Sequence, residues 1–162
     1  MDYVVVKWLH ILSSTLLFGT GIGSAWYMLF ANISRDVRAI AVVSRNVVIA
    51  DWLFTATTAV IQPATGFYMI HLAGYPFHSK WIMWSVALYV LAGACWLPVV
   101  WIQMRLRDLA AAAARTNAKL PPQYWRLFQT WVALGVPAFG AFVLIFWLMV
   151  AKPVYAKRNR RL

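Results

Sequence analysis

Four apolar stretches, each long enough to cross a bilayer, limit what this chain can fold into more than any other feature. They cover about residues 4–30, 47–72, 81–102 and 131–150. An α-helix needs about 20 apolar residues to cross about 30 Å of hydrocarbon, and each stretch meets that length. Because lipid offers the peptide groups no hydrogen-bond partner, each stretch must be helical. The sequence therefore predicts an all-α fold, an integral membrane four-helix bundle.

The rest of the chain is short connections. Four spans take up most of the 162 residues, so we expect one membrane domain over residues 1–162 and no separate soluble domain. Residues 103–119 contain an alanine run and predict a cytoplasmic helix extension that ends at Pro121 and Pro122. Residues 152–162 form a basic tail. The first span is too long for the apolar part of a cleavable signal, so we expect it to remain in the mature protein.

Basic residues predict the orientation of the spans. The loop expected over residues 32–46 has three arginines and the loop over residues 103–130 has five basic residues, whereas residues 73–80 have only Lys80. Cytoplasmic loops are enriched in lysine and arginine, so the first and third loops should be cytoplasmic and the N-terminus outside. The basic tail would then face outward, which disagrees with the same rule.

Two histidines are predicted at one depth in the membrane. Counted from the expected cytoplasmic ends, His10 and His71 both lie about 30 Å from the inner boundary, as does Lys152. Two imidazoles from two helices at one level are what axial ligation of a haem b requires, and Lys7 and Lys152 could pair with its propionates. We therefore predict His10 and His71 as haem-iron ligands. The alternative is that both are interfacial residues bonded to water or to neighbouring side chains.

Other polar residues in the spans have alternative structural and functional roles. Asp51 is expected to form an ion pair with Arg45, Arg105 or Arg107 or to act as a charge at a helix start, with a proton relay as the alternative. Pro63 removes a backbone donor and should free a carbonyl group, and Gln62 beside it either bonds that carbonyl or lines a cavity.

Small and sulfur-containing residues have simpler readings. Gly19 and Gly23 form a small-xxx-small pattern and should allow another helix to approach closely. A single cysteine, Cys95, excludes a disulfide framework. The methionines are soft ligands for Cu(I), but they do not cluster, so flexible core filling explains them better. No nucleophile–base pair or phosphate loop is visible, so any catalysis would need a bound cofactor, and catalytic residues are not assigned.

Several sequence blocks resemble a family of predicted bacterial integral membrane proteins catalogued as a domain of unknown function. They are KWLHILSSTLLFGTG at residues 7–21, DWLF at 51–54, WLPVVWIQ at 96–103 and LMVAKP at 148–153. More distantly, Lys7-Trp-Leu-His10 with Phe18-Gly19 is similar to the first span of haem-b-binding HemJ-type protoporphyrinogen oxidases and of CopD-type membrane domains. This similarity implies that His10 corresponds to the cofactor-binding histidine of the oxidases. Their other helices are not recognisable here, so the porphyrinogen substrate does not carry over.

Three classes of function follow. The first is a haem-b-binding, cytochrome b-like protein of the bacterial inner membrane with an electron-transfer role, including a haem-dependent oxidoreductase. The second is a cofactor-free accessory or assembly subunit of a larger membrane complex, and the third is a metal or small-solute transporter. The expected partners are the lipid bilayer and other membrane subunits or a second copy of the chain, and no feature indicates nucleic acid.

Overall fold

The computed structural model describes residues 2–158, with side chains over residues 2–151. That part of the chain folds into helices and contains no strand. The helices are α1 (Tyr3–Ser34), α2 (Val37–Ala50), the short π-helix η1 (Asp51–Thr55), α3 (Ala56–Ala73), α4 (Lys80–Thr116) and α5 (Pro122–Arg158). Because α2, η1 and α3 follow one another without a break, the chain forms four long helical segments, each long and apolar enough to cross a membrane. The predicted all-α fold with four long apolar segments is confirmed.

The first connection is much shorter than expected. Residues 32–46 are helical apart from Arg35 and Asp36, so the loop expected there is wrong. Arg35 ends α1 with a left-handed backbone (φ 56°), and the Asp36 carboxylate accepts the backbone N–H groups of Arg38 at 2.9 Å and Ala39 at 3.3 Å. These bonds satisfy free donors at the start of α2. The two segments therefore form a tight antiparallel hairpin.

The last connection also differs in detail. Helix α4 continues through the expected extension but ends at Thr116, where Asn117 takes a left-handed backbone (φ 50°). Pro122 does not end α4 and is instead the first residue of α5. Proline suits this position because the first helical N–H has no intrahelical partner to lose.

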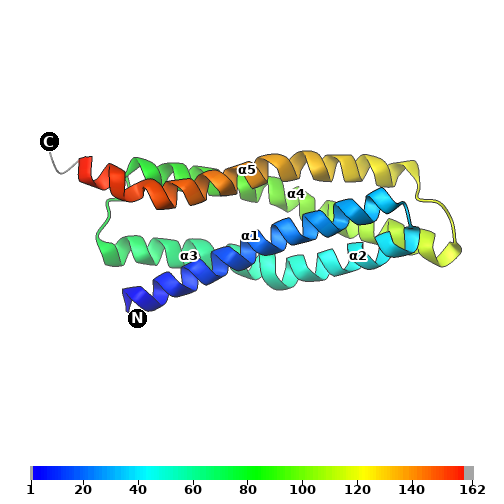
Figure 1. Cartoon of the computed structure of the whole chain (residues 1–162), viewed down its shortest axis with the longest axis horizontal. Coiled ribbons are helices and arrows are strands. Elements are labelled where there is room, and N and C mark those ends of the chain that lie inside the picture. Colours follow the sequence, from blue (N-terminus) through cyan, green and yellow to red (C-terminus); the bar gives the residue numbers. More distant parts are fainter. Residues whose placement is uncertain (1, 159–162) are drawn as a thin grey trace.

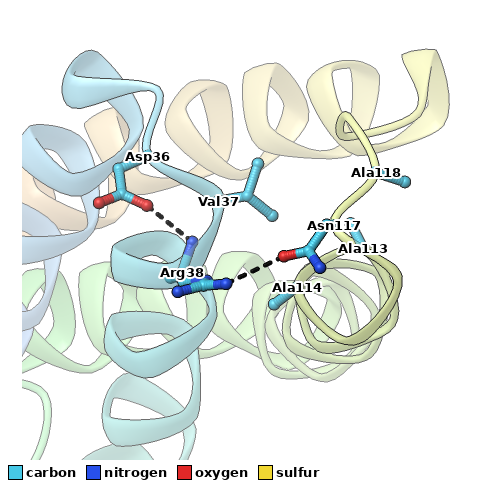
Figure 2. Close-up of a pocket in the computed structure, with 7 residues that line it drawn as sticks. All are labelled: Asp36, Val37, Arg38, Ala113, Ala114, Asn117 and Ala118. Carbon is cyan, nitrogen blue, oxygen red and sulfur yellow. Dashed lines mark hydrogen bonds between the residues drawn. The ribbon is translucent and has the colours of Figure 1, made fainter.

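The four segments run alternately in opposite directions, and both termini lie at the same end of the bundle (Figure 1). Helix α1 packs on α2 and α3, while α4 packs on α5 and α2. The α1–α2 and α4–α5 turns lie together at the opposite end (Figure 1). There the Arg38 guanidinium donates to Asn117 Oδ1 at 3.0 Å, beside an open pocket of about 200 Å³ that three alanines line together with Asp36, Val37, Arg38 and Asn117 (Figure 2). This bond ties the start of α2 to the end of α4.

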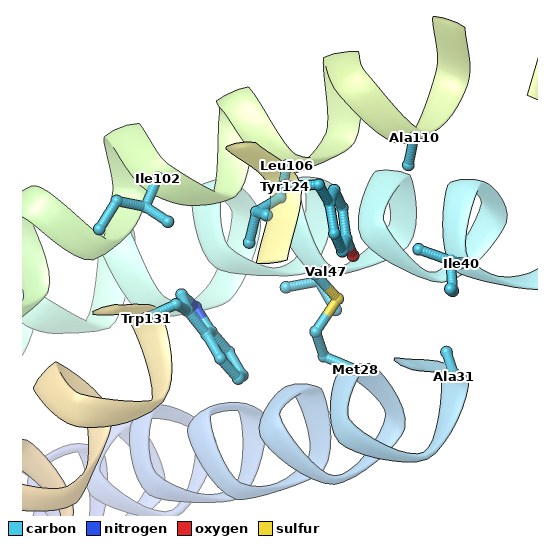
Figure 3. Close-up of a cluster of buried hydrophobic side chains, with 9 residues drawn as sticks. All are labelled: Met28, Ala31, Ile40, Val47, Ile102, Leu106, Ala110, Tyr124 and Trp131. Carbon is cyan, nitrogen blue, oxygen red and sulfur yellow. The ribbon is translucent and has the colours of Figure 1, made fainter. Parts of the chain in front are cut away.

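The tightest packing lies toward the end that carries these two turns. Nine buried residues from α1, α2, α4 and α5 point toward one another there (Figure 3): Met28, Ala31, Ile40, Val47, Ile102, Leu106, Ala110, Tyr124 and Trp131. In the half nearer the termini most large apolar side chains are exposed, for example Trp8, Val60 and Trp147. Exposed apolar side chains on all sides are expected where helices face lipid.

The helices are longer than a bilayer requires. With 37 residues, α4 is about 55 Å long, compared with about 30 Å of hydrocarbon. Arginines near the two turns, such as Arg35, Arg38 and Arg115, are costly to place in hydrocarbon. We therefore infer that the end with the packed core, the basic end, extends beyond the hydrocarbon and that the half nearer the termini lies within it.

Candidate functional site

The His10 side chain lies between α1 and α3, and both of its ring nitrogens have partners on α3. Nδ1 is 2.8 Å from Thr65 Oγ1, and Nε2 is 3.2 Å from Gln62 Nε2. The Thr65 hydroxyl donates to the Ile61 carbonyl, so it accepts from His10, and the network assigns the ring proton to Nδ1. The Ser13 hydroxyl donates to Gln62 Oε1, which orients the amide with its nitrogen toward the ring. The imidazole is thus neutral, and Nε2 holds its lone pair.

Gly66 and Pro63, both in α3, help to place His10 and Gln62. A Cβ atom at Gly66 would lie 3.3 Å from His10 Cε1, so a residue without a side chain is needed for close approach of the ring. Pro63 cannot donate to the Ala59 carbonyl, and the Tyr89 hydroxyl of α4 donates to that carbonyl at 2.6 Å. Tyr89 rather than Gln62 therefore replaces the lost bond, and Gln62 is left to hold His10.

The structure does not bring His10 and His71 to one level. His10 lies opposite Gln62 and Thr65, while His71 is exposed in the last turn of α3, about 9 Å further along the helix axis. The short turn explains the difference: His10 is 25 residues before Arg35, Gln62 is 26 after Asp36, and His71 is 35 after it. Depth counted from a long loop placed the two helices in the wrong register. The depths of residues in α1 and α3 should instead be counted from the short turn at Arg35 and Asp36.

The two lysines of the expected site lie on different helices. Lys7 is exposed on α1, one turn nearer the N-terminus than His10. Lys152 belongs to α5 but lies outside the residues whose side chains are described.

A second polar site surrounds Asp51, at the start of the π-helix between α2 and α3. Its side chain is 7% exposed, and Trp96 Nε1 donates to Oδ2 at 3.2 Å. The Gln103 amide nitrogen donates to Oδ2 at 3.1 Å, and the amide oxygen accepts from Trp131 Nε1 at 3.2 Å. Single π-helical turns inside α-helices are often found at functional sites.

The expected ion pair of Asp51 is wrong. Arg107 pairs with its neighbour Asp108 at 2.9 Å, and the Arg105 guanidinium lies 5.5 Å from the centre of the Trp101 ring. The donors to Asp51 are instead the Trp96 indole and the Gln103 amide. No spacing in the sequence links Trp96 to Asp51, so the indole donor was not predicted.

Most of the chain matches the model of a protein family. A family model described as "Predicted integral membrane protein (DUF2269)" matches residues 4–153. The chain belongs to the DUF2269 family. This comparison does not show the similarity to HemJ-type oxidases or CopD-type domains. No curated protein and no solved structure matches the chain.

The structure of this DUF2269 protein also bears on the roles expected for its glycines and methionines. A Cβ atom at Gly19 or Gly23 would meet nothing within 4 Å, so the helix contact predicted there is wrong within one chain. Met28 is fully buried in the core, as a core-filling residue should be. Among the described residues, no three His, Cys, Asp or Glu side chains come together in a way that could hold a metal ion.

Two sites with ionisable side chains thus occur in the DUF2269 chain, each joining two or more helices. At the His10 site the imidazole is held at both ring nitrogens, by Thr65 at Nδ1 and by Gln62 at Nε2. At the Asp51 site a buried carboxylate accepts bonds from neutral donors. Ionisable groups within membrane segments are costly and are commonly functional.

Proposed function

We propose that this membrane protein binds a haem b through Nε2 of His10 and has a redox role. The supporting observation is the bond between His10 Nδ1–H and Thr65 Oγ1. Histidines that ligate metals usually donate their other ring N–H to a fixed acceptor, which sets the tautomer and the ring orientation. Nε2 lies 3.2 Å from the Gln62 amide nitrogen, and ligation of iron would take the place of this contact.

The residues near His10 suit haem better than a bare metal ion. A structural or catalytic metal ion bound by protein alone needs three or four protein ligands, whereas a haem iron needs only one or two axial ligands from the protein. Lys7 and His71 lie nearer the termini than His10 and supply basic or donor groups for propionates, as Lys152 would from α5. Because His71 is about 9 Å beyond the level of His10, we assign it to a propionate rather than to the iron.

Haem b, when bound, supplies one-electron chemistry. The chain's own contribution is the orientation of the imidazole by Thr65 and the exclusion of water by the α1–α3 contact. Tight packing of His10 against Gly66 supports both roles.

The proposed location is the bacterial inner membrane with the N-terminus outside. The charges of the connections support this orientation, because residues 32–46 and 103–130 hold eight Lys and Arg residues, whereas residues 73–80 have only Lys80. The basic tail over residues 152–162 opposes it. His10 would then lie in the outer half of the bilayer.

A visible spectrum of the purified protein tests the haem proposal. Protein made with sufficient haem should show a Soret band and α and β bands on reduction. His10→Ala should abolish these bands, while His71→Ala should keep the Soret band with weaker haem retention. His78→Ala is the matched control, since His78 is an exposed histidine in the α3–α4 connection and should leave the spectrum unchanged. A colourless folded protein, or an unchanged spectrum in His10→Ala, would refute the proposal.

A second candidate is a cofactor-free accessory subunit of a membrane complex, favoured by the glycine face of α1. Gly19, Gly21 and Gly23 have open space around them, and in membranes such faces allow a second helix to approach closely. The partner would be another membrane subunit or a second copy of this chain. A colourless protein that co-purifies with a partner through this face would make this the leading function.

A further inference from the structure

A continuous polar face follows the α2–η1–α3 segment through the membrane. Its residues are Asp51, Thr55, Thr58, Gln62 and Thr65, at alternating spacings of four and three, which place them on one side of a helix. Asp51 and Thr55 are each 7% exposed and Thr58 is 3% exposed. Gln62 and Thr65 are partly buried. The face therefore points into the bundle and away from lipid.

Neighbouring helices add polar groups along the same face. At one end Asp51 bonds Trp96 and Gln103 of α4. In the middle, the Tyr89 hydroxyl of α4 reaches the Ala59 carbonyl, one residue from Thr58. At the other end Gln62 and Thr65 bond Ser13 and His10 of α1. Groups from three helices thus line one route.

The route extends over most of the hydrocarbon thickness. Asp51 and Thr65 are 14 residues apart, which is about 21 Å of the about 30 Å of hydrocarbon. Asp51 lies near the edge on the basic side, since Arg45 is less than two turns away along α2 and Arg105 is two residues beyond its partner Gln103. His10 lies near the opposite edge, one turn from the exposed Lys7.

We propose that this face is a proton path between Asp51 and His10. A proton taken from water on the basic side binds the Asp51 carboxylate, and a proton leaves the imidazole toward the termini side. Between them, protons move through bridging waters that bond to the Thr55 and Thr58 hydroxyls and to the Gln62 amide, because the Thr58 and Tyr89 hydroxyls themselves donate to backbone carbonyls. Only O–H and N–H bonds form and break, and one positive charge crosses for each proton.

The charges around Asp51 are consistent with this role. In the described part of the chain, Arg107 pairs with Asp108 and Arg105 lies over Trp101, so neither neutralises Asp51. Arg45 is exposed on α2, and Asp51 has no ion pair among the described residues, so a proton can balance its charge. The path applies to the protein without haem at His10, because Nε2 cannot both ligate iron and accept a proton. Asp51 and Thr58 lie outside the His10 site, so their variants test the path separately from the haem proposal.

Proton flux into vesicles tests the path. The full-length protein is reconstituted into lipid vesicles that contain a pH-sensitive dye, and a potassium gradient with valinomycin supplies the driving potential and the compensating charge. We expect faster acidification than in protein-free vesicles. Asp51→Asn and Thr58→Val should each reduce the flux to the protein-free level, whereas Thr58→Ser, which keeps the hydroxyl, should retain it.

Thr57→Val is the matched control for Thr58→Val. Both threonines bond a carbonyl of the preceding turn, but Thr57 is exposed on the lipid side. Thr57→Val should conduct like the wild type. Wild-type flux equal to that of empty vesicles, or equal flux in the wild type, Asp51→Asn and Thr58→Val, would overturn the proposal. Flux is compared only among variants whose melting temperature matches that of the wild type. If Asp51→Asn does not fold, the comparison of Thr58→Val with Thr58→Ser decides whether the path exists.

Discussion

At the scale of single residues, the position of His10 depends on the absence of a side chain at Gly66. The ring lies against α3 with Cε1 at 3.3 Å from where a Cβ would stand, and two bonds to Thr65 and Gln62 fix its rotation. Any larger residue at position 66 must push the ring or the helix aside. Close packing of this kind leaves little freedom for adjustment.

Gly66→Val should therefore destabilise the fold and displace His10. We expect a loss of about 1–3 kcal/mol, typical of extra atoms forced into a packed site, seen as a lower melting temperature in detergent. Gly19→Val makes the same change in helix propensity where the added atoms meet nothing, and it should leave the melting temperature nearly unchanged. Equal melting temperatures for the two variants would show that the ring does not pack against α3.

The sequence identified His10 but not its partners. An ionisable residue in an apolar helix is visible in sequence, and so is its resemblance to a known cofactor-binding histidine. Its bonds to residues 52 and 55 positions away depend on helix register, which apolar stretches do not specify. Asp51 is visible in the sequence for the same reason as His10, but its donors Trp96 and Gln103 lie on another hairpin, and nothing in the sequence pairs them with it.

At the scale of helices, the Asp36 side chain determines where the second segment begins. Asp36 starts α2 directly after α1, and this short turn fixes which residues of α1 and α3 face each other. The number of helices was predictable because hydrocarbon thickness sets their length. The turn was not predicted because three arginines suggested a long cytoplasmic loop, although Asp36 had the features of a helix N-cap.

Asp36→Ala should lower stability by about 1 kcal/mol, because two backbone N–H groups at the start of α2 lose their acceptor. Asp2→Ala is the control, since Asp2 precedes α1 but makes no side-chain cap bond. Thermal unfolding in detergent should rank the Asp36 variant below the Asp2 variant. The reverse ranking would be inconsistent with the cap.

Pro63 and Tyr89 should be energetically coupled. Tyr89→Phe leaves the Ala59 carbonyl without a donor and should cost about 1 kcal/mol. In a Pro63→Ala background the helix supplies its own N–H to that carbonyl, so the same substitution should cost much less. A double-mutant cycle measured by unfolding gives the difference directly. Additive effects would mean that the tyrosine hydroxyl does not replace the bond that proline removes.

At the scale of the whole molecule, the helical segments are too long to lie entirely in hydrocarbon. They have between 30 and 37 residues, and the arginine-bearing end holds the best packed core. The chain thus combines a lipid-embedded half that contains the His10 site with a more compact basic half beyond it. The orientation of these halves decides which side of the membrane each polar site can exchange with.

Labelling of single cysteines in intact cells should reveal that orientation. In a Cys95→Ala background, His78→Cys in the α3–α4 connection should react with a membrane-impermeant maleimide added outside. Ala118→Cys in the α4–α5 connection should react only after the membrane is permeabilised, because the basic end is expected in the cytoplasm. Leu144→Cys is the control for lipid exposure: Leu144 is 52% exposed in the isolated chain, yet it should stay unlabelled in both conditions because hydrocarbon covers it. Outside labelling of Ala118→Cys and protection of His78→Cys would reverse the orientation and move the His10 site to the cytoplasmic half of the bilayer.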